Sequence, residues 1–300
     1  MSGTSPKKLG SSKKREMSIA IISIYRNNKE NTRQQHKDKF LEQISILKKY
    51  GNFDVYLIEQ SSDNCKFNIG KLKNIGFQKA IQSKKKYDFF IFTDADIIPD
   101  KKLAPYYFKV RKGISLLATR GTRYQQSECF FGSCLGFDKK SYQQINGYPN
   151  NFWGWGGEDE AILIRANLNN INIYVPKKGS IIDLETNHQG QKIELNDKLK
   201  NLKNKNEKDN TKSEKEILET KIWRSNGLSN LDYQEISSSC SQEYGYNLNH
   251  YLVDLNYSQD HLKHTNWFDV SSFERMSYSQ LKKTRKQTLK KYKKCHPKYY

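Results

Sequence analysis

The feature that most constrains the fold is a regular alternation of apolar runs and helical patterns in the first hundred residues. Nearly continuous apolar runs occupy residues 17–25, 53–60 and 87–96, and such runs are typical of strands buried on both faces of a sheet. Between them, residues 32–50 and 68–84 carry apolar side chains at helical spacing. This order predicts right-handed βαβ units. We therefore expect an α/β protein with a Rossmann-like, mostly parallel sheet flanked by helices.

The pattern is looser after residue 100. We expect further short elements there, namely strands at 115–119, 129–137 and 171–175 and a helix at 158–169. Residues 195–221 are rich in Lys, Asn and Glu and contain few apolar side chains, which predicts an exposed helix or a mobile insertion. Residues 222–275 recover Trp, Tyr and Leu, so we expect them to pack as a C-terminal appendage.

Positive charge is concentrated at the two ends of the chain. The formal net charge is +20; residues 1–16 contain five Lys or Arg and one Glu, and residues 281–300 contain nine Lys or Arg and no acidic residue. The remainder is only moderately basic, which argues against nucleic acid as a partner. We expect a disordered basic arm over 1–16, one domain over 17–279 and a basic tail over 280–300. Contact of the ends with a polyanion or a membrane surface is the alternative.

The cysteines and the apolar runs bear on where the protein works. Five cysteines, an odd number without a Cys-x-x-Cys pair, argue against a disulfide framework and a zinc site and suit a reducing compartment. The sequence has no run of 18 apolar residues and no apolar signal-peptide core at its start. We therefore expect a soluble, cytoplasmic protein, and the sequence leaves its oligomeric state open.

Two acidic residues, Asp94 and Asp96, end the third apolar run. In an open α/β sheet, ligands bind outside the carboxyl ends of the strands. One of these carboxylates could ligate Mn²⁺ or Mg²⁺ while the other holds a ribose hydroxyl or a metal-bound water. A solvated turn is the alternative interpretation of the same residues.

A second cluster spans residues 150–160, Asn-Asn-Phe-Trp-Gly-Trp-Gly-Gly-Glu-Asp-Glu. Its glycines allow the backbone to approach a ligand closely, and its tryptophans offer flat apolar faces of the kind that stack on sugar rings. Glu158, Asp159 and Glu160 then begin the next expected helix, where the helix dipole favours negative charge. The cluster predicts a sugar site; helix-start carboxylates behind buried tryptophans are the structural alternative.

A third motif, residues 183–188 (Asp-Leu-Glu-Thr-Asn-His), follows another expected strand. His188 stands three residues after Glu185, and the two could complete a metal site opened by Asp96. Without such a context, a lone histidine is more often an ordinary surface or core residue.

Together these segments resemble the beta-1,4-galactosyltransferase family (glycosyltransferase family seven) over residues 17–236. FNIGKLKNIGF at 67–77 is similar to the family's helix FNRAKLLNVGF, and INGYPNNFWGWGGEDE at 145–160 nearly matches its signature. Three more segments resemble its first strand, its metal-binding strand and its closing segment: SIYRNNKEN at 23–31, FIFTDADIIP at 90–99 and TKIWRSNGLSNLDYQ at 220–234. The resemblance implies a GT-A fold, Mn²⁺ dependence, a UDP-sugar donor, a glycan or glycoprotein acceptor, and inversion at the sugar carbon.

The resemblance also implies roles for individual residues. Asp159 would be the catalytic base. The metal ligands would be Asp96, His188 and Glu185; the nucleotide-sugar contacts would be Arg26, Asn27, Asp94, Phe130, Gly132 and Trp155; and the acceptor contacts would be Glu160, Trp155 and Glu158. Residues 17–125 would form the nucleotide and metal half of the domain, and residues 126–279 the acceptor half and a lid.

Some positions depart from the family pattern. Ile69 stands where a donor-binding Arg is frequent, and Ala161 replaces a third acid. Glu185 falls where a Met ligand is common, which would make the metal site harder and more tolerant of Mg²⁺. Phe130 falls where the family limits space at the sugar's 2-position, so its bulk favours galactose. The alternatives are a transferase of another UDP-sugar (N-acetylgalactosamine or glucose) and a homologue that binds carbohydrate without turnover.

Overall fold

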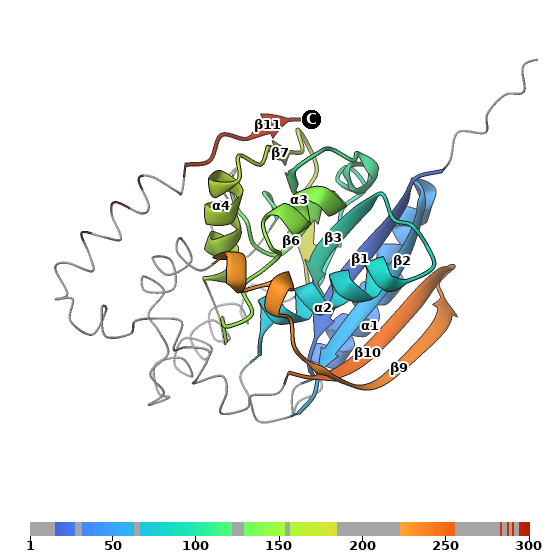
Figure 1. Ribbon diagram of the computed structural model, residues 1–300. Helices are drawn as coiled ribbons and strands as arrows, with labels where there is room; N and C mark the ends of the chain where they lie inside the picture. Colours follow the sequence, from blue (N-terminus) through green and yellow to red (C-terminus); the bar gives the residue numbers. More distant parts are fainter. Residues whose placement is uncertain are drawn as a thin grey trace, which may run out of the picture.

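A nine-stranded sheet forms the centre of the protein (Figure 1). The computed structural model describes residues 16–27, 32–62, 67–121, 129–153, 157–184, 223–255 and 294–300, together with the single positions 283, 287 and 290. The strands of the sheet are β1 (Ser18–Tyr25), β2 (Asn52–Gln60), β3 (Phe89–Asp94), β5 (Ile114–Leu116), β6 (Cys134–Phe137), β7 (Ile173–Val175), β9 (Gln234–Glu243), β10 (Tyr246–Asp254) and β11 (Lys298–Tyr299). A separate antiparallel pair joins β4 (Ile97–Pro99) to β8 (Ile181–Asp183).

The order of the strands confirms the mostly parallel α/β architecture. The order is β11-β7-β5-β6-β3-β1-β2-β10-β9. Strand β1 pairs in parallel with both β2 and β3, as the alternating pattern predicts. Of the described strands in this sheet, only β6 and β9 run against their neighbours. Since β1 lies in the middle of the sheet, all eight of its residues are buried, which explains why its sequence is apolar without alternation.

Helices cover both faces of the sheet and divide the core into two clusters. One face packs against α2 (Ile69–Gln82), α3 (Lys139–Gln144) and α4 (Glu158–Leu168). The other packs against α1 (Thr32–Gln43) and the 3-10 helices η1 (Ile44–Lys49) and η2 (Ala104–Phe108). Two short 3-10 turns, η3 (Trp223–Ser225) and η4 (Leu228–Asn230), precede β9. The helix expected over 32–50 thus ends at Gln43 and continues as a 3-10 turn.

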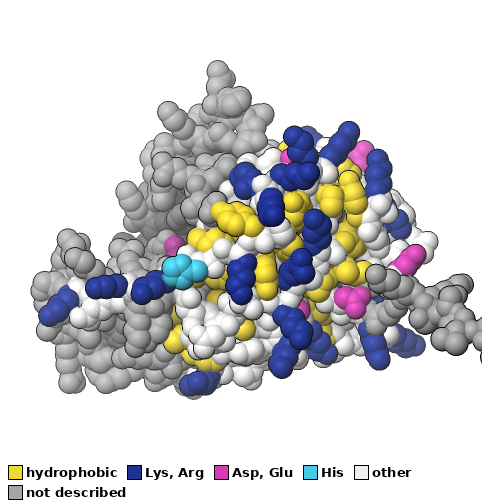
Figure 2. Space-filling view, turned by 90° about the horizontal axis from the view of Figure 1, so that it is seen from above, with side chains coloured by type: hydrophobic (Ala, Val, Ile, Leu, Met, Phe, Trp, Pro, Cys, Tyr) yellow, Lys and Arg dark blue, Asp and Glu magenta, His cyan; other side chains and the backbone are white. Residues whose placement is uncertain are grey.

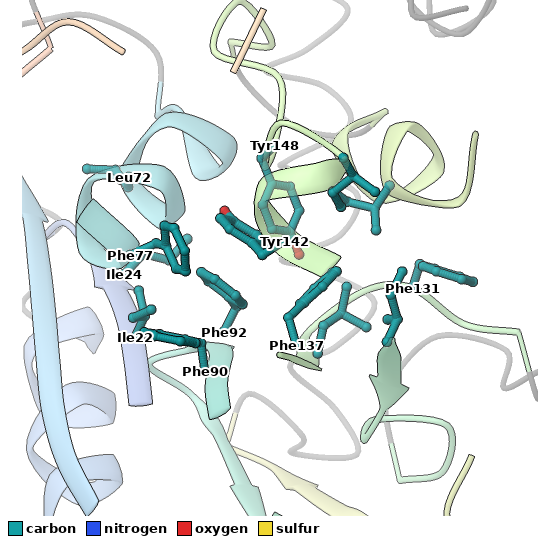
Figure 3. Packing of buried hydrophobic residues seen from close by; sticks show 14 of the residues in the cluster. Ile22, Ile24, Leu72, Phe77, Phe90, Phe92, Phe131, Phe137, Tyr142 and Tyr148 are labelled. Atoms are coloured by element: carbon teal, nitrogen blue, oxygen red, sulfur yellow. The ribbon is translucent and has the colours of Figure 1, made fainter. Parts of the chain in front are cut away.

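Aromatic rings fill the core between β3 and the helices α2 and α3 (Figure 3). Phe92 of β3 stacks on Tyr142 of α3 with ring centroids 4.5 Å apart, and Phe77 of α2 lies 4.5 Å from the same ring. Tyr148 closes the cluster, 6.0 Å from Phe92. Such rings bury about 150–250 Å² each, so this cluster fixes α2 and α3 against the strand that carries Asp94.

The segment expected to pack as an appendage extends the main sheet in its described part. Residues 234–254 form the β9–β10 hairpin, in which β10 pairs in parallel with β2. Strand β9 lies at the edge and its side chains are almost all exposed. Its polar, Ser-rich sequence suits an edge strand that faces water. Because this strand contains no apolar run, it is not predicted from the sequence.

The end of the chain differs from the solvated basic tail that its sequence predicts over 280–300. Lys298 and Tyr299 form β11 beside β7, and the Tyr300 amide donates to the Val175 carbonyl oxygen at 3.3 Å. The Tyr300 ring packs 5.3 Å from Tyr106. Lysine and arginine dominate the composition here, but two terminal tyrosines bind the last residues to the sheet.

A disulfide joins Cys129 to Cys295, 166 residues apart in sequence. This corrects the expectation that the cysteines form no disulfides, and it removes the argument for a reducing compartment. Spacing rules could not find the pair because the two cysteines are distant in sequence and meet only after the C-terminal segment reaches the sheet. Among the described cysteines, Cys134 is free and buried and Cys240 is free and exposed.

Candidate active site

The carboxyl ends of β1 and β3 lie side by side and bring the first predicted site residues to one edge of the sheet. Ile24 of β1 is in register with Asp94 of β3. Arg26 and Asn27 directly follow β1, and Asp96 follows β3 by two residues. The neighbouring strands therefore place these four side chains at the edge where open α/β sheets bind ligands.

Strand β6 begins at the same edge and adds Phe130 and Gly132. The Asp94 amide donates to the Ser133 carbonyl oxygen at 3.1 Å, so the segment before β6 lies against the end of β3. A side chain at Gly132 would collide with its surroundings: an ideal Cβ there would lie 2.5 Å from Phe130 Cζ and 2.9 Å from Asp159 Oδ2. Gly132 thus allows the Asp159 carboxylate to lie directly over the backbone.

Helix α4 presents three acids in its first turn. Gly157 precedes them with φ +98°, a left-handed conformation that favours glycine, and it turns the chain into the helix. Glu158 is 5% exposed, whereas Asp159 and Glu160 are half-buried. Asp159 and Glu160 are therefore the two carboxylates of this turn that a ligand could reach, and Glu158 faces the protein interior.

A buried cation, Lys73 of α2, lies beside these acids. Its Nζ lies 3.6 Å from Asp94 Oδ1 and 5.1 Å from the Tyr148 ring centroid. Burial lowers the pKa of Lys73, but the nearby Asp94, Asp159 and Glu158 outweigh that effect and raise it above its usual value. Burial and the charge of Glu158 raise the pKa of Asp159 well above its usual range, and Lys73 offsets only part of that rise.

Asp96 stands next to the segment that leads to the other predicted metal ligands. It is 8% exposed, and Arg33 Nη1 lies 3.2 Å from its Oδ2. The Leu184 amide donates to the Asp96 carbonyl oxygen at 2.8 Å, which places residue 184 beside Asp96. Trp155, Glu185 and His188 lie outside the described residues. Within the described ranges, His, Cys, Asp and Glu do not gather in any group of three that could hold a metal ion.

A buried polar network, absent from the sequence predictions, holds the segment 145–151 in place. Asn74 Nδ2 donates to the Tyr148 carbonyl oxygen and to Asn150 Oδ1, both at 2.8 Å. Arg165 of α4 is fully buried, and its guanidinium donates to the carbonyl oxygens of Gly147 at 2.7 Å and Asn226 at 2.6 Å. The network ties α2, α4 and the turns before β9 to the chain that precedes Asp159. Buried polar residues do not recur at the spacing of a helix or a strand, so the sequence pattern could not identify them.

Charge is distributed unequally between the two edges of the sheet. The loops at the opposite edge carry exposed basic side chains, namely Lys48, Lys49, Lys84, Lys85, Lys86, Lys109, Arg111, Lys112, Lys139 and Lys140. Figure 2 shows Lys and Arg spread over this face of the molecule, with few acidic side chains among them. The edge that carries Asp94, Asp96 and Asp159 therefore lies away from the most basic part of the described surface. Among the described residues, no helix has the length and apolarity needed to cross a membrane.

Two family models match this chain. One, described as the N-terminal region of glycosyl transferase group 7, matches residues 7–108. The other, described as the N-terminal domain of galactosyltransferase, matches residues 115–189. Between them they include β1 to β8 and the predicted site residues from Arg26 to His188.

Known proteins show the same relationship. Beta-1,4-galactosyltransferase 4 of Mus musculus is 26% identical over 226 residues, which cover 73% of this chain and 59% of the relative. Beta-1,4-galactosyltransferase 1 of Mus musculus is 36% identical over 152 residues, covering 49% of this chain and 36% of the relative. The chain thus spans less than two thirds of the length of these relatives.

A solved structure has the same fold. It is a mutant of Drosophila beta-1,4-galactosyltransferase 7 in complex with manganese, UDP-Gal and xylobiose, with a TM-score of 0.64, 20% identity, and coverage of 84% of this chain and 98% of that chain. The sheet and its acidic edge define the GT-A class of glycosyltransferase folds. Within that class, the chain belongs to the glycosyltransferase group 7 family, which includes the beta-1,4-galactosyltransferases.

Proposed function

We propose that this protein transfers galactose from UDP-galactose to a sugar hydroxyl of a glycan, with inversion at the sugar carbon and in a divalent-cation-dependent manner. The observation that carries the proposal is the position of Asp159, whose carboxylate lies over Gly132 at the edge where Asp94 and Asp96 end β3. The relatives of this chain are named galactosyltransferases, and the solved structure with the same fold contains manganese, UDP-Gal and xylobiose.

Asp159 is the proposed general base. An inverting single displacement needs one group that accepts the proton of the attacking hydroxyl while the diphosphate leaves from the opposite face. Burial and Glu158 raise the pKa of Asp159 well above its usual range, which makes its carboxylate a stronger proton acceptor than an exposed aspartate. Glu160, one residue further along the helix, would orient the acceptor hydroxyl together with Trp155. Glu158, for which the resemblance implied the same role, is 5% exposed and would act on Asp159 through its charge.

The donor would bind between the ends of β1, β3 and β6. Arg26, Asn27 and Asp94 would contact the nucleotide, and Phe130 and Gly132 would lie beside the sugar with Trp155 on the covering loop. The Phe130 ring lies close to Gly132, so it would reduce the space available to a substituent at the sugar's 2-position. This supports galactose over N-acetylgalactosamine.

Asp96 would belong to the site of the divalent cation. Asp96, Glu185 and His188 would supply two carboxylates and an imidazole, a donor set that suits Mn²⁺ and also admits Mg²⁺. The hydrogen bond from Leu184 to Asp96 supports this set, because Glu185 is the next residue after Leu184. When bound, the ion would offset negative charge on the departing diphosphate.

The test is a donor and acceptor panel measured with the whole chain. UDP release is followed with Mn²⁺ and either UDP-galactose, UDP-N-acetylgalactosamine or UDP-glucose, with and without xylobiose or N-acetylglucosamine as the acceptor. The expected result is acceptor-dependent UDP release that is fastest with UDP-galactose. Turnover with another sugar only would replace the donor assignment. Binding of all three donors without turnover would identify a carbohydrate-binding homologue and overturn the proposal.

A further inference from the structure

Lys73 of α2 is a buried cation. It lies in the middle of α2 and is 2% exposed. A buried lysine must find compensating charge or hydrogen-bond acceptors, because removing an ammonium group from water is costly. The surroundings of Lys73 therefore indicate what it does.

Its compensating groups all belong to the proposed catalytic centre. The Nζ atom lies 3.6 Å from Asp94 Oδ1 on β3, and the charges of Asp159 and Glu158 on α4 also act on it. The Tyr148 ring lies beneath the ammonium, 5.1 Å away. The Tyr148 hydroxyl is buried and makes no hydrogen bond to any described residue, although the carboxylates of Asp159, Asp94 and Glu158 are near enough to influence it.

Another lysine on the same helix shows that burial alone does not require such a site. Lys71 lies two residues earlier and is 8% exposed. Its Nζ donates to the Leu255 carbonyl oxygen at 2.8 Å, beyond the end of β10. Lys71 therefore links the helix to the chain after the hairpin, whereas Lys73 reaches the carboxylates on the other side.

We propose that Lys73 is a positioning residue of the transfer reaction: its ammonium holds Asp94 at the end of β3 and supplies a fixed positive charge that allows the carboxylates of Asp94, Glu158 and Asp159 to lie at the same edge of the sheet. This inference rests on the proposed function. Lys73 acts through these carboxylates and does not contact the substrates, since its side chain is 3% exposed and lies against the Tyr148 ring.

The charge of Lys73 should set the pH range in which Asp159 works. Among the described residues, the charges that act on Asp159 are those of Glu158 and Glu160 on its own helix, Asp94 on β3, and Lys73 on α2. Lys73 alone among them favours the ionised carboxylate. Without Lys73, Asp159 would keep its proton to higher pH. The acidic limb of the pH profile of kcat/KM for sugar transfer would then move to higher pH.

The experiment compares Lys73→Met with Lys71→Met and Lys73→Arg in the full chain. The readouts are the pH profile of kcat/KM for galactosyl transfer, the separate values of kcat and KM, and the thermal unfolding midpoint. For Lys73→Met we expect the acidic limb to move to higher pH and kcat near neutral pH to fall about tenfold to hundredfold, with the acceptor KM little changed. Lys73→Arg should restore part of kcat and return the limb toward its original position. Lys71→Met should lower the unfolding midpoint without moving the limb.

A second readout keeps the inference independent of turnover. Carboxyl carbons of ¹³C-labelled aspartate are titrated by NMR in the ligand-free protein, and the signal of Asp159 is assigned with Asp159→Asn. If the wild type transfers no sugar, the proposed function fails, but an upward shift of this titration in Lys73→Met still supports the charge role. An unchanged titration overturns it.

If Lys73→Met does not fold, the double variant Lys73→Met/Asp94→Asn removes both members of the ion pair. Its recovery of folding supports the pairing with Asp94. The inference would be contradicted if the double variant also failed to fold. It would also be contradicted if Lys73→Met and Lys71→Met had the same acidic limb in their pH profiles.

Discussion

The C-terminal segment 294–300 provides the most quantitative structural prediction. It is attached to the body of the protein by the disulfide from Cys295 to Cys129, by the pairing of β11 with β7 and by Tyr300. The Tyr300 ring packs against Tyr106 at 5.3 Å and Tyr174 at 5.9 Å, and its hydroxyl pairs with the Ser115 hydroxyl. Because Cys129 is adjacent to Phe130, this attachment also fixes one end of the segment that forms the sugar side of the proposed site.

The expected losses follow from these contacts. Truncating a large, well-packed aromatic side chain costs about 3–5 kcal/mol in a full core; Tyr300 is half-buried, so we expect Tyr300→Ala to cost about 2–3 kcal/mol. A cross-link that closes a loop of 166 residues restricts the unfolded chain, with an upper estimate of about 5 kcal/mol and a typical effect of about 2–4 kcal/mol. Deleting 294–300 should therefore remove about 4–6 kcal/mol, a large part of the stability of an ordinary domain.

The assay is urea unfolding followed by tryptophan fluorescence, with and without a thiol reductant. Cys295→Ser and Cys129→Ser should each lower the free energy of unfolding by the same amount, and reductant should destabilise the wild type but neither variant. Cys240→Ser is the matched control, because Cys240 is exposed and free and its replacement should change nothing. The account is wrong if reductant leaves the wild-type midpoint unchanged and Tyr300→Ala costs less than about 0.5 kcal/mol, the range of ordinary surface substitutions.

Three more predictions concern the centre itself. Arg165→Met should cost about 3–5 kcal/mol in urea unfolding, because it leaves buried carbonyl oxygens of Gly147 and Asn226 without their donors; a loss below about 1 kcal/mol would contradict the role of the network. Arg33→Met should tighten Mn²⁺ binding about threefold to tenfold in calorimetry without donor, since it removes a partly screened positive charge 3.2 Å from Asp96, and unchanged or weaker binding would argue against metal at Asp96. The raised pKa of Asp159 means that its contribution to stability is fully present below the unfolded-state pKa of about 4 and declines as pH rises. Asp159→Asn should thus be more stable than wild type at neutral pH, with the difference vanishing toward pH 3 in thermal unfolding. An equally stable wild type at pH 7 would count against the crowding of negative charge around Asp159.

The central parallel strands could be predicted from the sequence because strands buried on both faces consist of consecutive apolar residues. β1, β2 and β3 are covered on both faces, so each is an apolar run, and α2 repeats its buried side chains at helical spacing. The carboxyl ends of β1 and β3 must then meet at one edge. For this reason the order of the strands along the chain is enough to group Arg26, Asn27, Asp94 and Asp96.

The edges of the sheet and the support of the site could not be predicted in the same way. Strand β9 is polar because it faces water, and β11 has only two residues in a Lys-rich segment. Arg165 and Lys73 are charged residues in buried places, where composition predicts a solvated helix face. Their partners are carbonyl oxygens and carboxylates distant in sequence, so only the folded chain reveals why these charges are tolerated.

The central claim is that Asp159 accepts the proton of the acceptor hydroxyl, and one paired measurement on Asp159→Asn tests it most directly. Asparagine keeps the shape of the side chain but cannot take up the proton, and loss of a general base lowers a rate by about 10²–10⁴. Galactosyl transfer is measured beside calorimetric binding of UDP-galactose with Mn²⁺ for the wild type and the variant. The account predicts transfer reduced by that factor with donor binding within about twofold of wild type. Near-normal transfer by a folded variant that binds the donor would show that another group is the base.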